Sequence, residues 1–282
     1  MQAMSLLAMA INGFKPQPME LPAFITSAKN AVNQCHIDTG ATIQMIEIIS
    51  NITDTSLIEQ VMVKLNGQAI VDLTGADLKD LLEAYTKRTR AAGRYVIPFY
   101  KPEARTIDGI RSGELVTLPS DNLTLFVKVG DTGATVPTLR ARALVTPSQS
   151  QRVVIPRMDS IDITAAASGE NVLNWNDRDA NVQVQRLHFQ AADITKLEVK
   201  RDELTVFEAT LEDNNADLSE GGDNAPVANT YHFDPAHTGF VLQGLFATVA
   251  RKSLKFRYTK TAAGNVRVVR ELLEQVAALP QL

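Results

Sequence analysis

The fold of this chain is decided by Ile58-Glu59-Gln60-Val61-Met62-Val63-Lys64-Leu65-Asn66, which returns as Ile194-Thr195-Lys196-Leu197-Glu198-Val199-Lys200-Arg201-Asp202. Apolar residues occupy matching places in the two segments, Lys64 matches Lys200, and the second segment follows the first by nearly half the length of the chain. Apolar and polar residues alternate with the period of a β-strand. In the first copy Asn66-Gly67 can supply the two positive φ angles of a type I′ turn, so a hairpin is predicted there.

Five further matches flank this segment in the same order in both halves of the chain. Their spacing is close to that of the hairpin and drifts only slowly along the chain, as expected if insertions and deletions fall in loops. The matched pairs are Leu21-Pro22 with Ile155-Pro156, Ala41-Thr42-Ile43-Gln44-Met45 with Ala180-Asn181-Val182-Gln183-Val184, Tyr95 with Tyr231, Leu123-Thr124-Leu125-Phe126-Val127 with Leu254-Lys255-Phe256-Arg257-Tyr258, and Leu139-Arg140-Ala141 with Val266-Arg267-Val268. A whole domain has therefore been duplicated. The polar, Pro-containing stretch 146–151 predicts a boundary between units 1–147 and 148–282.

Short strands separated by Gly, Pro, Asn and Asp clusters are predicted along both halves. About eight strands in each half, packed as two antiparallel sheets, make a jelly roll, so the fold class is all-β with two tandem jelly rolls. The predicted strands, besides those of the hairpin and its copy, include 43–48, 123–129, 138–145, 240–247, 253–259 and 265–272.

One segment of the first half has helical instead of strand periodicity. Leu78, Leu81, Leu82 and Tyr85 share a helix face, and Thr74 with Asp77 three residues later resembles a capping box. The basic residues of 87–94 suit the end of a helix, where the macrodipole favours cations, and Gly93 can terminate it. A helix over about 75–91 is therefore predicted. In the second half, the corresponding acidic stretch 212–224 is predicted to be only a turn or loop.

This arrangement resembles the double jelly-roll major capsid proteins of tailless icosahedral viruses with an internal membrane, above all the corticovirus type. The resemblance rests on residues 46–145, where the strand Ile58–Asn66 and the turn at Gly67 precede a Leu-rich helix that ends in Lys87-Arg88-Thr89-Arg90. It implies a homotrimer whose six jelly rolls form a pseudo-hexagonal capsomer. It also implies neighbouring capsomers, vertex and membrane proteins of the virion as partners, and a DNA-containing membrane vesicle underneath. Some relatives bind calcium.

Composition fits such a protein and gives no sign of a nucleic-acid coat. The 282 residues carry a net charge of −4 and are 45% hydrophobic, which suits two globular domains but not direct DNA binding through a basic face. Residues 1–11 lack the basic flank of a secretory signal and are interpreted as an arm that packs on a neighbour or on its own body, or that contacts lipid. The protein is expected in the virion after synthesis in the host cytoplasm.

Catalytic signatures are absent from the sequence, so no enzymatic activity is predicted. The only cysteine, Cys35, is assigned a structural or surface role, because adjacent His36 would point to the other face of a strand. The four histidines have no metal-binding spacing, and the interpretation is that they are exposed in loops. They are His36, His188, His232 and His237.

An acidic stretch in the second half is the best candidate metal site. Asp213, Asn215 and Asp217 alternate like the first ligands of an EF-hand loop, although Leu218 and Asn224 stand where that loop needs Gly and Glu. The sequence thus predicts at most a weak calcium site, with a solvated surface loop as the alternative. No other cofactor is expected.

Two other functions remain open for tandem jelly rolls. One is an amidase that removes glycans from proteins, which requires carboxylates clustered between the two rolls. The other is a carbohydrate-binding module, which usually exposes aromatic side chains, whereas the only tryptophan here is Trp175. Either would be expected as a monomer, and a capsid protein as a trimer.

Overall fold

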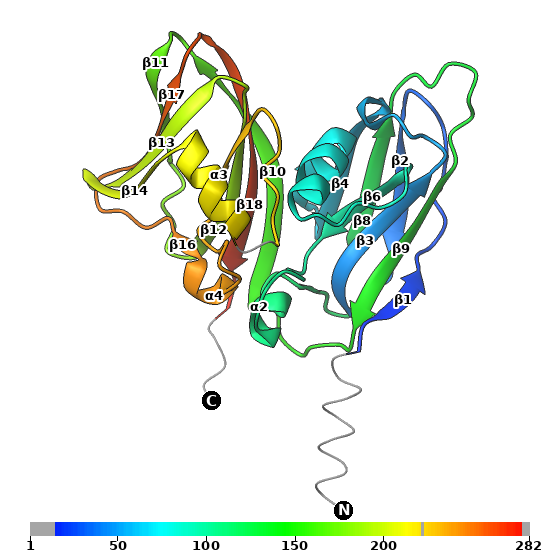
Figure 1. Ribbon diagram of the computed structural model, residues 1–282. Coiled ribbons are helices and arrows are strands. Elements are labelled where there is room, and N and C mark those ends of the chain that lie inside the picture. The colour runs from blue at the N-terminus through cyan, green and yellow to red at the C-terminus, as the bar shows by residue number, and fades with distance from the viewer. Residues whose placement is uncertain (1–14, 221–222, 278–282) are drawn as a thin grey trace, which may run out of the picture.

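The computed structural model describes residues 15–220 and 223–277 and contains two β-sheet halves that lie side by side (Figure 1). Two sheets form the first half, in the orders β1-β9-β3-β6 and β2-β8-β4-β5, and β7 pairs with β3. Its strands are β1 (Gln17–Glu20), β2 (Ala31–Ile37), β3 (Thr42–Ser50), β4 (Ile58–Leu65), β5 (Gln68–Leu73), β6 (Arg94–Pro98), β7 (Leu115–Val116), β8 (Leu123–Val129) and β9 (Leu139–Thr146).

The second half repeats this topology strand for strand. Its sheets have the orders β10-β18-β12-β15 and β11-β17-β13-β14, and β16 pairs with β12. Each half therefore has the two four-stranded sheets of a jelly roll plus one two-residue strand, as the duplicated sequence predicts. The strands are β10 (Val154–Ala165), β11 (Gly169–Asn174), β12 (Val182–Gln190), β13 (Ile194–Arg201), β14 (Leu204–Thr210), β15 (Thr230–Phe233), β16 (Phe246–Ala247), β17 (Leu254–Lys260) and β18 (Gly264–Gln275).

The turns of the duplicated hairpin have the same backbone in both halves. Asn66 and Gly67 have φ angles of 51° and 85°, as predicted for a type I′ turn, and Asp202 and Glu203 have 49° and 70°. The second turn lacks glycine, but Asp202 accepts hydrogen bonds from the backbone N–H groups of residues 251–253. These bonds lower the pKa of Asp202 to about 2. They stabilise a left-handed conformation that Asp tolerates better than most residues.

Each half has its own apolar core, but the core of the first half includes side chains of the second. Met158 of β10 and Val269 of β18 are buried together with residues of the first half such as Val71 and Leu81. In addition, β5 and β10 are joined in parallel through the pair Val71 and Met158. The two halves are consequently one packed body at this seam.

The helix predicted after the first hairpin is present but shorter. Residues 75–85 are helical, with a π-helical centre, η2 (Asp77–Glu83). Thr74 and Asp77 exchange the hydrogen bonds of the predicted capping box, at 2.9 and 3.1 Å. The predicted end at 91 is wrong, because Gly93 does not terminate the helix. At φ 75° it lies against Ser50, whose N–H donates to the Gly93 carbonyl at 2.8 Å.

Two predictions for the second half are wrong. The acidic stretch predicted as a turn or loop is mostly the helix α3 (Leu211–Glu220). It repeats one bond of the first helix's capping box, because the Asp213 N–H donates to Thr210 Oγ1 at 3.2 Å, while the Thr210 hydroxyl donates to Asp213 Oδ2 at 2.7 Å. The predicted strand 240–247 is the short helix α4 (Val241–Gly244) followed by β16. At Gly244 an added Cβ would lie 2.5 Å from Ala236 Cα and 2.7 Å from the Pro235 carbonyl oxygen, so the end of α4 packs closely on the turn after β15.

Two further short helices complete the described structure. The 3-10 helix η1 (Thr55–Leu57) precedes β4, and α2 (Ile107–Arg111) packs against α4 at the end of the molecule where β1 begins (Figure 1). In the described residues no helix is both long and apolar enough to cross a membrane.

Candidate functional site: the contact between the two halves

A buried group of charged side chains lies where the two halves meet, and Arg186 is at its centre. Arg186, on β12, is 4% exposed and donates from Nε to Asp234 Oδ2 at 2.8 Å. Its Nη2 group pairs with Glu103, in the loop after β6, and Nη1 lies 3.8 Å from Glu271 Oε1 on β18. The guanidinium of Arg186 thus binds one carboxylate of the first half and two carboxylates of the second half.

Glu271 is the second centre of this charged group. It pairs with Lys101 of the first half and accepts a hydrogen bond from His188 Nε2 at 3.1 Å. Burial alone would raise the pKa of Glu271, but Lys101 and Arg186 hold it well below its usual range. Arg186 itself is costly to bury, yet Asp234, Glu103 and Glu271 raise its pKa well above the usual value. Arg186 and Glu271 are therefore both charged at neutral pH.

His188 and His232 form a hydrogen-bonded relay beside Glu271. They are directly opposite each other on β12 and β15, with their Nδ1 atoms 2.7 Å apart. The Val227 N–H donates to His232 Nε2 at 2.9 Å, so His232 carries its proton on Nδ1 and donates it to His188. His188 then donates from Nε2 to Glu271, which leaves both rings neutral. Burial, His188 and Arg186 lower the pKa of His232 to about 2.

The predicted exposure of the four histidines is thus wrong for two of them, since His188 and His232 are fully buried. His36 is exposed but lies on strand β2 and not in a loop, and His237 is half-buried. The strand pattern held a signal for this arrangement. Arg186 and His188 alternate with Leu187 and Phe189, which places the polar pair on one face of β12 and the apolar pair on the other. The sequence of β12 alone does not show that both faces of this strand are buried.

Tyr85, at the end of the helix 75–85, inserts from the first half into this group. Its hydroxyl donates to Asp234 Oδ2 at 2.9 Å, and its carbonyl accepts from Ala225 N–H at 2.7 Å. The ring stacks on His232 at 4.5 Å and meets His188 edge-on at 5.2 Å. Burial and Asp234 raise the pKa of Tyr85, so it stays a neutral donor. The helix therefore fixes the position of the second half.

A further ion pair joins the halves at the other end of the same helix. Asp77 accepts from Arg267 of β18, at 2.7 Å to Nη2 and 3.2 Å to Nε. Asp77 is 2% exposed, and although burial opposes it, Arg267 and Thr74 lower its pKa. This bidentate geometry is the strong form of an arginine–carboxylate pair.

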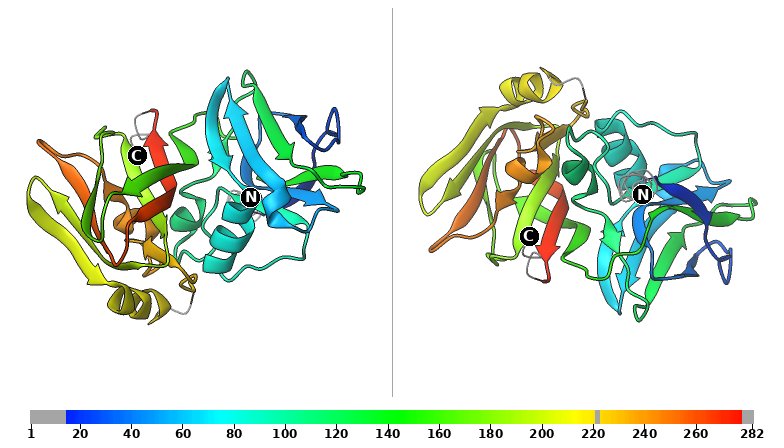
Figure 2. Two further views of the ribbon diagram at one scale, coloured as in Figure 1. Left: turned by 90° about the horizontal axis from the view of Figure 1, so that it is seen from above. Right: turned by 90° about the horizontal axis from the view of Figure 1, so that it is seen from below.

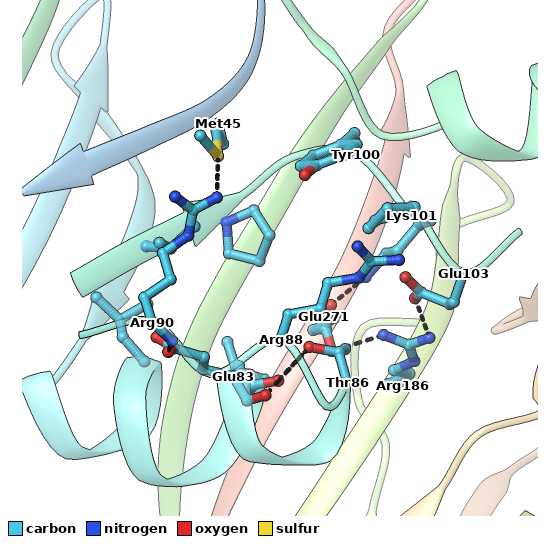
Figure 3. Close-up of a pocket in the computed structure, with 15 residues that line it drawn as sticks. Met45, Glu83, Thr86, Arg88, Arg90, Tyr100, Lys101, Glu103, Arg186 and Glu271 are labelled. Carbon is cyan, nitrogen blue, oxygen red and sulfur yellow. Dashed lines mark hydrogen bonds and ion pairs between the residues drawn. The ribbon is translucent and has the colours of Figure 1, made fainter. Parts of the chain in front are cut away.

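A small cavity of about 50 Å³ lies next to the charged group (Figure 3). Apolar residues of the helix and β6 line one side, and Arg88, Lys101, Glu103 and Arg186 line the other. The cavity has the volume of a few water molecules. Arg90, which also lines the cavity, pairs with Glu47. Glu47 is completely buried between Arg90, Arg94 and Arg142, which lower its pKa against the effect of burial. The basic residues after the helix thus serve partly to neutralise Glu47, which the sequence did not reveal.

The predicted calcium ligands do not converge on one point. Asp213, Asn215 and Asp217 are positions i, i+2 and i+4 of α3, so Asn215 faces away from the two aspartates. Within 15–220 and 223–277, no cluster of three or more His, Cys, Asp or Glu side chains is arranged to hold a metal ion. Calcium binding at these residues stays a prediction, and it would require ligands from elsewhere.

Cys35 is buried on β2, and burial followed by Asp38 raises its pKa to about 11, so it is unreactive there.

The comparisons with known proteins agree with this architecture in both halves. Residues 18–148 match the family described as viral coat protein P2 N-terminal domain, and residues 155–276 match the viral coat protein P2 C-terminal domain. The chain belongs to the P2 family of viral coat proteins. The P2 family is structural, so the predicted non-enzymatic role and location in the virion are confirmed. The carboxylates that the amidase alternative requires between the rolls are present as Glu103, Asp234 and Glu271, but each is buried in an ion pair with Arg186 or Lys101. The family match supports neither the amidase nor the carbohydrate-binding alternative.

Solved structures show that P2 family members share their fold with other viral capsid proteins. The major capsid protein P2 of bacteriophage PM2 has a TM-score of 0.84 at 18% identity, covering 95% of this chain and 100% of that one. The Sulfolobus turreted icosahedral virus protein has 0.69 at 12%, covering 94% of both chains, and the PBCV-1 capsid protein 0.62 at 10%, covering 94% and 97%. No curated protein sequence matches significantly. The double jelly-roll prediction is confirmed.

Proposed function

We propose that this coat protein is the major capsid protein of an icosahedral virus and that it assembles as a homotrimer. The observation that carries the proposal is the match of both halves to the two domains of one coat protein family. Three copies of a chain with two similar rolls supply six similar units, which suits a pseudo-hexagonal tile, and closed symmetry is usual for homo-oligomers. The boundary between the units is placed at 147/148, just after β9.

The further partners follow from the same family resemblance. Neighbouring capsomers surround each trimer, vertex and membrane proteins of the virion contact it, and a membrane vesicle containing DNA lies beneath the shell. The net charge of −4 supports the absence of direct nucleic-acid binding. Synthesis is placed in the host cytoplasm.

Binding of a calcium ion at α3 is tested by measuring the trimer's melting temperature with calcium and with a chelator.

Light scattering coupled to gel filtration tests the trimer. We expect a mass of three chains of 30.8 kDa at micromolar concentration, because obligate interfaces bury more than about 2,000 Å². A protein that is only monomeric under these conditions contradicts the proposal. Nanomolar, salt-sensitive DNA binding would contradict the absence of direct nucleic-acid contact.

A further inference from the structure

The contact between the two halves of one chain uses parts that the duplication supplies twice. Asp77, at the start of the first helix, binds Arg267 of β18 in the other half, and β5 lies beside β10. This contact has a polarity, since the hairpin and helix of one unit meet the outer strands of the next. The second unit has the same hairpin and helix, and the first unit has the same outer strands.

The two charged residues of this contact have counterparts at the spacing of the repeat. Asp213 follows Asp77 at the same distance along the chain as the second hairpin follows the first, and Thr210 holds it as Thr74 holds Asp77. Arg140 is the counterpart of Arg267 in the last matched segment of the repeat. Both members of the pair are thus present a second time, in the same local structure.

Within one chain these counterparts do not meet and are exposed to solvent. Asp213 is exposed and makes no ion pair with any described residue, whereas its equivalent Asp77 is 2% exposed. Arg140 is 59% exposed in its side chain, and among the described residues its ion pair is with Glu20, itself half in solvent. Figure 2 shows the reason, because the helix 75–85 (cyan) lies between the halves and α3 (yellow) lies on the outer side of the second half.

The strands beside these residues each have one unpaired edge among the described residues. β14 is the counterpart of β5, but it ends its sheet among the described residues and exposes Leu204 (72%) and Val206 (46%). β1 is the counterpart of β10 and ends a sheet of the first half, with three of its four residues exposed. An exposed edge strand with apolar side chains is a ready surface for another chain.

We propose that the surface formed by β14 and the start of α3 binds β1 and β9 of a second copy, repeating the contact inside the chain. In this interface Asp213 of one copy binds Arg140 of its neighbour, and β14 lies beside the neighbour's β1. The proposal rests on the self-association put forward under the proposed function and names its surfaces. Because the two surfaces differ, the contact is heterologous, and it gives a closed ring when the rotation closes.

Charge reversal tests the proposed pair in the full-length protein. Asp213→Arg and Arg140→Asp, each alone, place like charges in the interface, and we expect the dissociation constant of the oligomer to rise on the order of tenfold or more. Combining the two substitutions restores opposite charges and should recover most of the loss. Asp217→Arg, one turn further along α3, is the matched control and should change the oligomer little. The readout is light scattering over a dilution series.

The outcomes separate this inference from the proposed function. If the unaltered protein is monomeric, the proposed function fails and this inference fails with it. If the unaltered protein is a trimer that Asp213→Arg leaves intact, or that the double variant does not recover, only the inference is overturned.

Thr210→Val weakens the helix cap but keeps the charge, so it should preserve the trimer. A melting curve by circular dichroism for each variant identifies misfolding, and Asp213→Asn, with its smaller side chain, then replaces Asp213→Arg and should weaken the trimer.

Discussion

Arg186 is the residue on which the mutual orientation of the halves depends most. It neutralises Glu103, Asp234 and part of Glu271 in a place that solvent does not reach. Ion pairs of this kind often add little net stability, because desolvation cancels the attraction, but breaking one leaves a buried charge without a partner. The group therefore acts more as a constraint on geometry than as a source of stability, and the Arg186 guanidinium lies 5.3 Å from the centre of the Tyr85 ring.

Replacing Arg186 with leucine should strongly destabilise the protein. Glu103 and Asp234 would lose their buried cation, and we expect a loss of about 3–5 kcal/mol in the free energy of unfolding. Urea denaturation followed by tryptophan fluorescence measures the loss. Lys196→Met removes the exposed pair with Glu208 and should have little effect. Equal effects of the two substitutions would show that Arg186 does not hold the halves in register.

His232 should make stability depend on pH in the mildly acidic range. Its folded pKa of about 2 lies below the ordinary value of 6.5, so between these values the unfolded chain binds a proton that the folded protein does not. Stability from this residue is complete above pH 6.5 and falls with acidification, by up to about 1.4 kcal/mol per pH unit. His232→Gln should flatten the curve of melting temperature between pH 6.5 and 4.5, while exposed His36→Gln should not. A slope unchanged by His232→Gln would contradict the neutral relay.

Among the structural elements, the helix 75–85 and its return to the sheet depend on one glycine. Gly93 has φ 75°, and a Cβ there would lie 2.3 Å from the Ser50 carbonyl oxygen. Gly67, in the hairpin turn, also has a positive φ, but a Cβ would meet nothing within 4 Å. Comparing alanine substitutions at these two positions therefore separates the cost of backbone strain from the cost of steric overlap.

Gly93→Ala should accordingly cost more than Gly67→Ala. The left-handed conformation alone costs about 1–2 kcal/mol for alanine, and this is the whole effect expected at Gly67. At Gly93 the overlap with Ser50 adds to it, since β3 and β6 must separate locally. Melting temperatures of the two variants measure the difference. Similar temperatures would mean that the junction of β3 and β6 is softer than the structure indicates.

Elements with strong local signals could be predicted from the sequence, and those defined by their partners could not. The Asn66-Gly67 turn and strand β8 were predicted at their observed places because turn chemistry and alternation are local. The sequence does not reveal α3, because its acidic composition resembles a loop, although Thr210 and Asp213 share the spacing and the N–H to hydroxyl bond of Thr74 and Asp77. For the buried charged group, single residues gave no signal. Arg186, Glu103 and Glu271 lie far apart in the sequence, and only the packing of the halves brings them together.

At the scale of the whole molecule, the duplicated units are no longer independent. The first core includes Met158 and Val269, and β5 and β10 connect sheets of both halves. Ion pairs between the halves, among them Lys101–Glu271, Arg186–Glu103 and Arg267–Asp77, are largely removed from solvent. Such an interface resembles the inside of one domain more than the polar contacts usual between domains.

A chain cut between the halves should therefore remain one particle. We expect that a protease site placed at Gln149-Ser150, in the linker between β9 and β10, can be cleaved completely without separating residues 1–149 from 150–282. Among the described residues, only two side-chain pairs join the linker to the first half. Gln149 donates to Thr42 at 3.4 Å, and Arg152 donates to Asp121 at 2.6 Å. Gel filtration of the cleaved protein, with a denaturing gel of the peak, measures association. Elution of two separate fragments would show that the buried charges and shared core do not hold the halves together.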